Sequence, residues 1–81
     1  NKNYKDMQLT KYTKHVLNEG IEITVKVLKN GVTGYKNIAR LIQAGGYYKE
    51  SEGWFVDMTR ENYESKCKLL RCFQMEYFIH K

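Results

Sequence analysis

The chain has 81 residues, of which 42% are apolar and 28% charged, and its formal net charge is +5. This length gives one domain, residues 1–81, and the composition is that of a folded chain rather than a disordered one. No apolar run approaches the roughly 20 residues of a membrane span and no basic-then-apolar leader opens the chain, so we expect a cytoplasmic protein with no membrane partner. Because the chain begins with Asn1 rather than Met, a longer N-terminal segment can precede it.

The positive surplus lies in the first half of the chain. Residues 1–36 hold seven Lys against three acidic residues, a net of +4, whereas residues 37–81 hold seven basic against six acidic residues, a net of +1. Positive potential attracts nucleic-acid phosphates, acidic protein surfaces and anionic lipid alike. The charge therefore narrows the class of partner without choosing one.

The first predicted element is an amphipathic helix over residues 6–18. Apolar residues recur there at helical spacing, and Gly20 stands where a helix C-cap is expected. A strand is the alternative, because Tyr12, Thr13 and Val16 favour β structure and residues 18–20 can form a hairpin turn.

A strand and a second helix follow. Apolar residues at 21, 23, 25 and 27 alternate with Glu22, Thr24 and Lys26, which is the period of a half-buried strand. Thr33 then caps a helix that runs to Ala44. Its predicted core-facing residues are Tyr35, Ile38, Leu41 and Ile42, and its predicted outward residues are Lys36, Arg40 and Gln43.

Residues 46–58 are predicted as a β-hairpin that carries four aromatic residues on strands 47–50 and 54–58. Strand parity assigns Trp54, Val56 and Met58 to the core. Phe55 and one of the two tyrosines, Tyr47 or Tyr48, then point to the other face. Such rings form either half of a core or a docking platform.

The last two elements complete the predicted fold. Thr59 caps a helix that buries Tyr63, Cys67, Leu70 and Phe73, and a strand follows over residues 75–80. After the first helix the order is β-α-β-β-α-β, which predicts an α+β, ferredoxin-like fold. Its four-stranded antiparallel sheet carries two helices on one face, and the extra N-terminal helix can lie on the open face.

A winged-helix-like domain is the alternative fold. In it the helix over residues 34–44 would read DNA and residues 46–58 would form the wing. That fold needs two helices between its first strand and its wing, and residues 29–44 have room for one.

No catalytic, metal or cofactor signature is present. His15 and His80 are 65 positions apart, and neither stands in a recognisable motif. Cys67 and Cys72 lie roughly 140° apart around a helix, so they do not readily pair, and no zinc-ligand spacing is found. We therefore expect no enzyme activity, no metal site and no cofactor.

Two groups of residues predict contacts with nucleic acid. The segment Gly31-Val32-Thr33-Gly34 offers amide groups to an anion, and it is flanked by the basic residues Lys29, Lys36 and Arg40. The equally weighted alternative is that the glycines serve the turn and the charges solvate the helix. The outer sheet face combines a lysine with aromatic rings, as single-stranded nucleic-acid platforms do; these residues are Lys26, Tyr48, Phe55 and Phe78.

Residues 53–58, Gly-Trp-Phe-Val-Asp-Met, resemble the third-strand motif of RNA-recognition (RRM) domains. They lack its leading basic residue, the small residue between its aromatics and its final aromatic. The first strand also lacks the matching aromatic, so these six residues do not assign the chain to that family.

Two functions follow from the sequence. The first is a small, basic, non-catalytic accessory module that binds nucleic acid, with phosphate contacts from the basic residues and base contacts from the aromatic ones. The second is a small subunit or inhibitor that docks through its aromatic hairpin on a larger protein, such as a nucleic-acid-processing one. A composition rich in Lys, Asn and Tyr is typical of AT-rich genomes and mobile elements. The sequence leaves open DNA against RNA, sequence specificity and oligomeric state.

Overall fold

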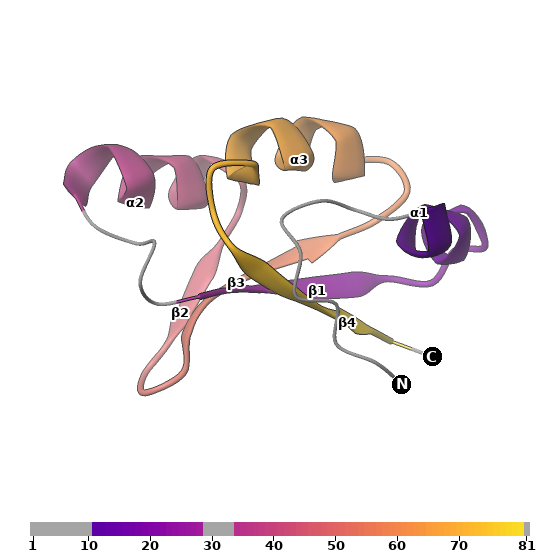
Figure 1. The fold of residues 1–81 in the computed structure, drawn as a ribbon, viewed down its shortest axis with the longest axis horizontal. Coiled ribbons are helices and arrows are strands. Elements are labelled where there is room, and N and C mark those ends of the chain that lie inside the picture. The colour runs from indigo at the N-terminus through magenta and orange to yellow at the C-terminus, as the bar shows by residue number, and fades with distance from the viewer. Residues whose placement is uncertain (1–10, 29–33, 81) are drawn as a thin grey trace.

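A computed structural model describes residues 11–28 and 34–80 of the chain. Within these residues the fold is α+β, with a four-stranded antiparallel sheet and three helices (Figure 1). The elements are α1 (Lys11–Asn18), β1 (Ile23–Val27), α2 (Gly34–Gln43), β2 (Tyr47–Lys49), β3 (Gly53–Met58), α3 (Tyr63–Leu70) and β4 (Met75–Ile79). Between β1 and β2 the described residues form one helix, where the winged-helix alternative requires two.

The strand order in the sheet is β2-β3-β1-β4, so β1 and β3 are the central strands. All neighbouring strands are antiparallel, and Val25 in β1 lies opposite Val56 in β3 and Tyr77 in β4. Two further backbone hydrogen bonds extend the β1–β4 pairing at its ends, from Leu28 to Gln74 (2.8 Å) and from His80 to Glu22 (3.0 Å). Segments far apart in sequence therefore form the middle of the molecule.

One face of the sheet packs under α2 and α3 and forms the core (Figure 1). The period-two prediction is confirmed here, because the alternate residues of each long strand are buried. These residues are Ile23, Val25, Val27, Val56, Met58, Met75, Tyr77 and Ile79. Trp54, also predicted in the core, is half-buried and packs against it.

Helix α1 confirms the helical prediction over residues 11–18, and residues 6–10 lie outside the described part of the chain. Val16 and Leu17 are buried in the same core as α2 and α3. The Lys14 ammonium lies 5.8 Å from the centre of the Tyr63 ring of α3. The first helix therefore lies at the end of the helix layer, beside the start of α3 (Figure 1), and not on the open sheet face.

The predicted core face of α2 is wrong for three of its four residues. Leu41 is buried, but Tyr35, Ile38 and Ile42 are exposed. The helix instead contacts the core through Leu41 and Ala44, the residue after its end. Thr33, its predicted cap, lies outside the described residues.

A close backbone contact lies where the end of α2 meets the sheet. The Gly46 N–H donates to the carbonyl oxygen of Leu41 at 2.7 Å. A side-chain Cβ at Gly46 would stand 2.8 Å from that oxygen and 3.3 Å from the carbonyl oxygen of Phe55. A glycine is therefore the residue that fits between the last turn of α2 and the sheet.

We predict that Gly46→Ala lowers the free energy of unfolding by about 1–3 kcal/mol, because the added methyl group overlaps the Leu41 carbonyl oxygen and crowds that of Phe55. Ser51→Gly is the control. Ser51 has a φ of +72° in the hairpin turn, so a glycine relieves strain there and keeps the stability within about 1 kcal/mol of wild type. Urea unfolding followed by Trp54 fluorescence measures both variants. Equal stability of Gly46→Ala and wild type would contradict the close contact.

Candidate functional site

The sheet face that points away from α2 and α3 carries a polar network that runs from β2 across β3 and β1 to His80, the residue after β4. The Tyr47 hydroxyl donates to Asp57 Oδ1 at 2.9 Å, and the Thr24 hydroxyl donates to the same oxygen at 2.7 Å. Thr24 Oγ1 also lies 2.5 Å from His80 Nε2. Because the single hydroxyl hydrogen of Thr24 goes to Asp57, the hydrogen of the second bond belongs to His80 Nε2.

This network links side chains of the sheet through the buried Thr24 hydroxyl. Thr24 is buried, and its oxygen both donates and accepts a hydrogen bond. The pKa of Tyr47 is raised above its usual value, first by burial and then by the hydrogen bond to, and the charge of, Asp57. A smaller effect of the Thr24 hydroxyl opposes this shift.

The aromatic residues of this face do not form an open stacking platform. Phe55 points to this face, as strand parity predicted, but only 7% of its surface is exposed. The Tyr47 ring stacks beside it with centres 5.9 Å apart, and the Lys49 ammonium lies 4.8 Å from the centre of the Phe55 ring. The prediction that Phe55 is an exposed aromatic is therefore wrong, because the edge strand β2 shields it.

The other predicted residues are divided between two surfaces. Tyr48 pairs with Trp54 on the helix side of the sheet, with ring centres 5.7 Å apart, so Tyr47 is the tyrosine beside Phe55. Lys26 and Phe78 are half-buried on the open face. The net charge of that face is zero, since it carries two lysines and two carboxylates: Lys26, Lys49, Asp57 and Glu76.

The positive charge of the described residues concentrates instead on α2 and α3. Helix α2 carries two basic residues and no acidic one, and α3 with the residue after it carries three basic residues against Glu64. The net charge of α2 and α3, with Arg71 included, is thus +4. Its basic residues are Lys36, Arg40, Lys66, Lys68 and Arg71.

A surface hollow of about 410 Å³ lies between α2 and α3. Its lining contains two of the predicted phosphate-binding residues and no carboxylate; the lining residues are Lys36, Ala39, Arg40, Gln43 and Leu69. Sequence reasoning placed Gln43 on the outward side of α2 but gave it no role. Gln43 follows Arg40 by three positions and Lys36 by seven, and this spacing places the three side chains on one side of the helix. Lys29, the third basic residue of the predicted patch, lies outside the described residues.

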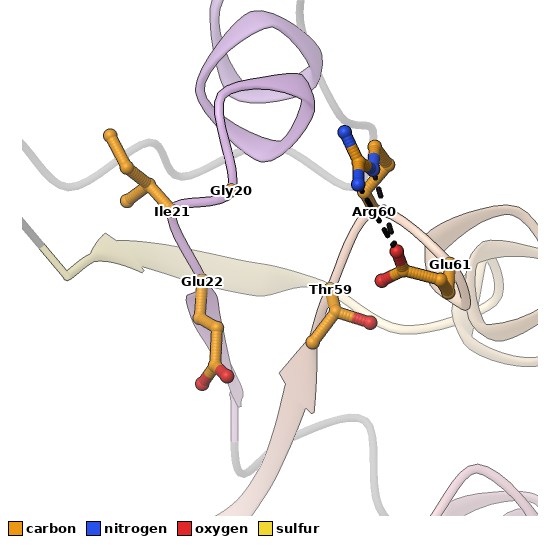
Figure 2. A pocket seen from close by; sticks show the side chains of 6 residues that line it. All are labelled: Gly20, Ile21, Glu22, Thr59, Arg60 and Glu61. Carbon is orange, nitrogen blue, oxygen red and sulfur yellow. Dashed lines mark hydrogen bonds and ion pairs between the residues drawn. The ribbon is translucent and has the colours of Figure 1, made fainter.

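A second pocket, of about 250 Å³, lies between the α1–β1 turn and the β3–α3 turn (Figure 2). Arg60 pairs with Glu61 at 3.4 Å and donates to the carbonyl oxygen of Asn18, at the C-terminal end of α1, at 3.3 Å. Figure 2 shows Glu22 directed away from Arg60. We interpret the pocket as the place where α1 is held to the rest of the fold. Arg60 is bound by Glu61 and by the end of α1, and Glu22 points away from both (Figure 2).

The thiols and possible metal ligands add no further site. Both cysteines are free; Cys72 is exposed, and Cys67 is half-buried, with its pKa raised by burial and by the charge of Glu64. Across residues 11–28 and 34–80, no three side chains of His, Cys, Asp or Glu come together as metal ligands. That a metal is not required stays a prediction.

Comparisons with known proteins leave the chain unassigned. No protein-family model, curated protein or solved structure matches it. No helix in the part that the structure describes is long and apolar enough to cross a membrane. The cytoplasmic location expected from the sequence stays a prediction.

We predict that Thr24→Val lowers the free energy of unfolding by about 1–3 kcal/mol, because His80 and Asp57 each lose their hydrogen bond to the buried Thr24 hydroxyl. Thr24→Ser is the matched control: it keeps the oxygen, and we expect it to lose about 1 kcal/mol or less through the missing methyl group. Urea unfolding at neutral pH compares the two. The network has no energetic role if the valine variant is as stable as the serine variant.

The raised pKa of Tyr47 predicts a specific alkaline titration. Its folded pKa lies above the unfolded value of 10.0, so its contribution to stability is complete below pH 10 and is lost as the pH rises through the folded pKa. Asp57→Asn should lower the Tyr47 pKa, because the negative charge that opposes ionisation is gone. Absorbance at the tyrosinate band, with Tyr47→Phe used to subtract the other tyrosines, measures it. An unchanged Tyr47 pKa in Asp57→Asn would contradict the network.

Proposed function

We propose that the protein is a non-catalytic module that binds nucleic acid through phosphate contacts from its helix layer. The observation that carries this proposal is the hollow between α2 and α3, where Lys36 and Arg40 meet with no carboxylate in the lining. Guanidinium and ammonium groups together suit phosphate oxygens, and the Gln43 amide supplies a neutral donor beside them. The net charge of +4 on α2 and α3 supports the same surface.

The arrangement favours contacts to the backbone over contacts to bases. Phe55 is shielded and the open sheet face is electrically balanced, so the sheet lacks the stacking rings and positive field of a single-strand platform. Phosphate contacts position a protein on nucleic acid without reading sequence. We therefore propose binding with little sequence preference.

We also propose that residues 23–79 form a ferredoxin-like unit. Two features support this fold. The element order from β1 to β4 is β-α-β-β-α-β. In the sheet, β3 lies between β1 and β2, which α2 connects, and β1 lies between β3 and β4, which α3 connects.

Docking on another protein is the second candidate function. It is favoured by the exposed apolar residues of α2 and β2, which include Tyr35 and Ile42. These side chains lie outside the charged hollow, so the two functions use different surfaces.

A titration of labelled single- and double-stranded oligonucleotides, followed by fluorescence anisotropy over a salt series, tests nucleic-acid binding. We expect affinity to fall with salt, and the double variant Lys36→Gln/Arg40→Gln to reduce the slope of log K against log salt by about 2, one for each lost contact. The control, Lys26→Gln/Lys49→Gln, removes the same charge from the open sheet face and should leave the slope unchanged. The proposal fails if wild type does not bind at low salt or if both variants lose affinity equally.

A further inference from the structure

All five large apolar side chains that are exposed in the described part of the chain lie on α2 and β2. They are Tyr35 (92% exposed), Ile42 (61%), Tyr48 (59%), Ile38 (38%) and Tyr47 (37%). Surfaces of monomeric proteins carry such residues singly, so a group confined to two consecutive elements marks a contact surface. We call the part formed by Tyr35, Ile38, Ile42 and Tyr48 the apolar edge.

The helical part of the apolar edge faces away from α3. Tyr35, Ile38 and Ile42 follow the spacing i, i+3, i+7 and so form one stripe on α2. The stripe lies roughly 130° around the helix from the basic side that lines the hollow toward α3. Helix α2 ends the helix layer on that side of the molecule (Figure 1), so this stripe has no neighbouring helix among the described elements.

The strand part of the apolar edge is an edge strand. β2 pairs with β3 on one side, and no other described strand pairs with it. Tyr48 points to the same side of the sheet as α2, because it lies opposite Trp54, which packs against the core. The outer backbone of an edge strand can pair with a strand of another molecule.

We propose that the apolar edge is the interface of a homodimer, in which the β2 strands of two copies pair antiparallel about a two-fold axis at Tyr48. The occupant is a second copy because the α2 stripe bears no charge, and a two-fold axis brings the same uncharged stripe against it. The sheet then continues from one molecule into the next. This inference does not depend on nucleic-acid binding, since the basic hollow is on the other side of α2.

Charge complementarity selects the register of this pairing. With the axis at Tyr48, that residue faces its own mate on the helix side, and Lys49 faces Tyr47 of the second copy on the open side. Lys49 already lies 5.9 Å from the centre of the Tyr47 ring within one chain, so the contact repeats a cation–π arrangement that the molecule forms. Centring the axis on Lys49 would oppose two lysines, which is destabilising.

Sedimentation of the whole chain without nucleic acid is measured from about 5 µM to about 1 mM. This range brackets the dissociation constant that we expect, because the proposed interface is small for a specific one. We expect the average mass to rise from that of a monomer to that of a dimer. Ile42→Asp should remain monomeric, because it buries a charge at the interface. Gln43→Asp, an acidic residue on the other side of the same helix, should dimerise like wild type. Since residue 42 is exposed, the variant should fold, and circular dichroism checks this.

Cross-linking tests the register. In a Cys67→Ala/Cys72→Ser background, Tyr48→Cys should form a disulfide between chains under mild oxidation, because directly opposed Cα atoms lie about 5 Å apart. Lys49→Cys should not, because residue 49 lies opposite Tyr47 of the second copy and is offset by two positions from its own mate. A wild type that stays monomeric at the highest concentration, or a dimer that Ile42→Asp leaves intact, overturns the proposal. A disulfide through Lys49→Cys in place of Tyr48→Cys overturns the register.

Discussion

The orientation of α2 on the sheet determines how this molecule presents its surfaces. The Gly46 N–H donates to the Leu41 carbonyl oxygen at 2.7 Å, in a space where a Cβ would overlap that oxygen and crowd the carbonyl oxygen of Phe55. With this end of α2 held against the sheet, Leu41 and Ala44 must fill the core. The remaining sides of the helix then follow from its period of 3.6 residues.

That rotation gives one helix two exposed surfaces of different chemistry. Lys36 and Arg40 turn toward α3 and line a hollow without carboxylates, whereas Tyr35 and Ile42 turn toward the edge of the sheet. On the open sheet face, the Asp57 carboxylate already accepts hydrogen bonds from the Tyr47 and Thr24 hydroxyl groups. Both binding surfaces that we propose therefore lie on α2 and its neighbours.

Sequence periodicity predicted the strands well and the exposed surfaces poorly. Alternation identified the buried residues of β1 and β4 because every second residue of a half-buried strand must be apolar.

Periodicity did not identify the buried side of α2. Tyr35, Ile38 and Ile42 form an apolar stripe whether it faces the core or a partner, so the helical period alone does not decide between the two. Strand parity placed Phe55 on the correct face, yet its burial depends on Tyr47 and Lys49 across the hairpin. The network around Thr24 depends on the pairing of β1 with β3 and β4, which local pattern does not show.

The orientation of α2 is the central claim, and methyl NOE spectroscopy on the wild-type protein tests it most directly. If the claim is right, the Leu41 and Ala44 methyl groups show NOEs to core methyls such as those of Val56, and the Ala39 methyl shows NOEs to Leu69 across the hollow. The Ile42 methyl groups show none to the core. NOEs from Ile38 and Ile42 to the core, with none from Ala44, would contradict the orientation and with it both proposed surfaces.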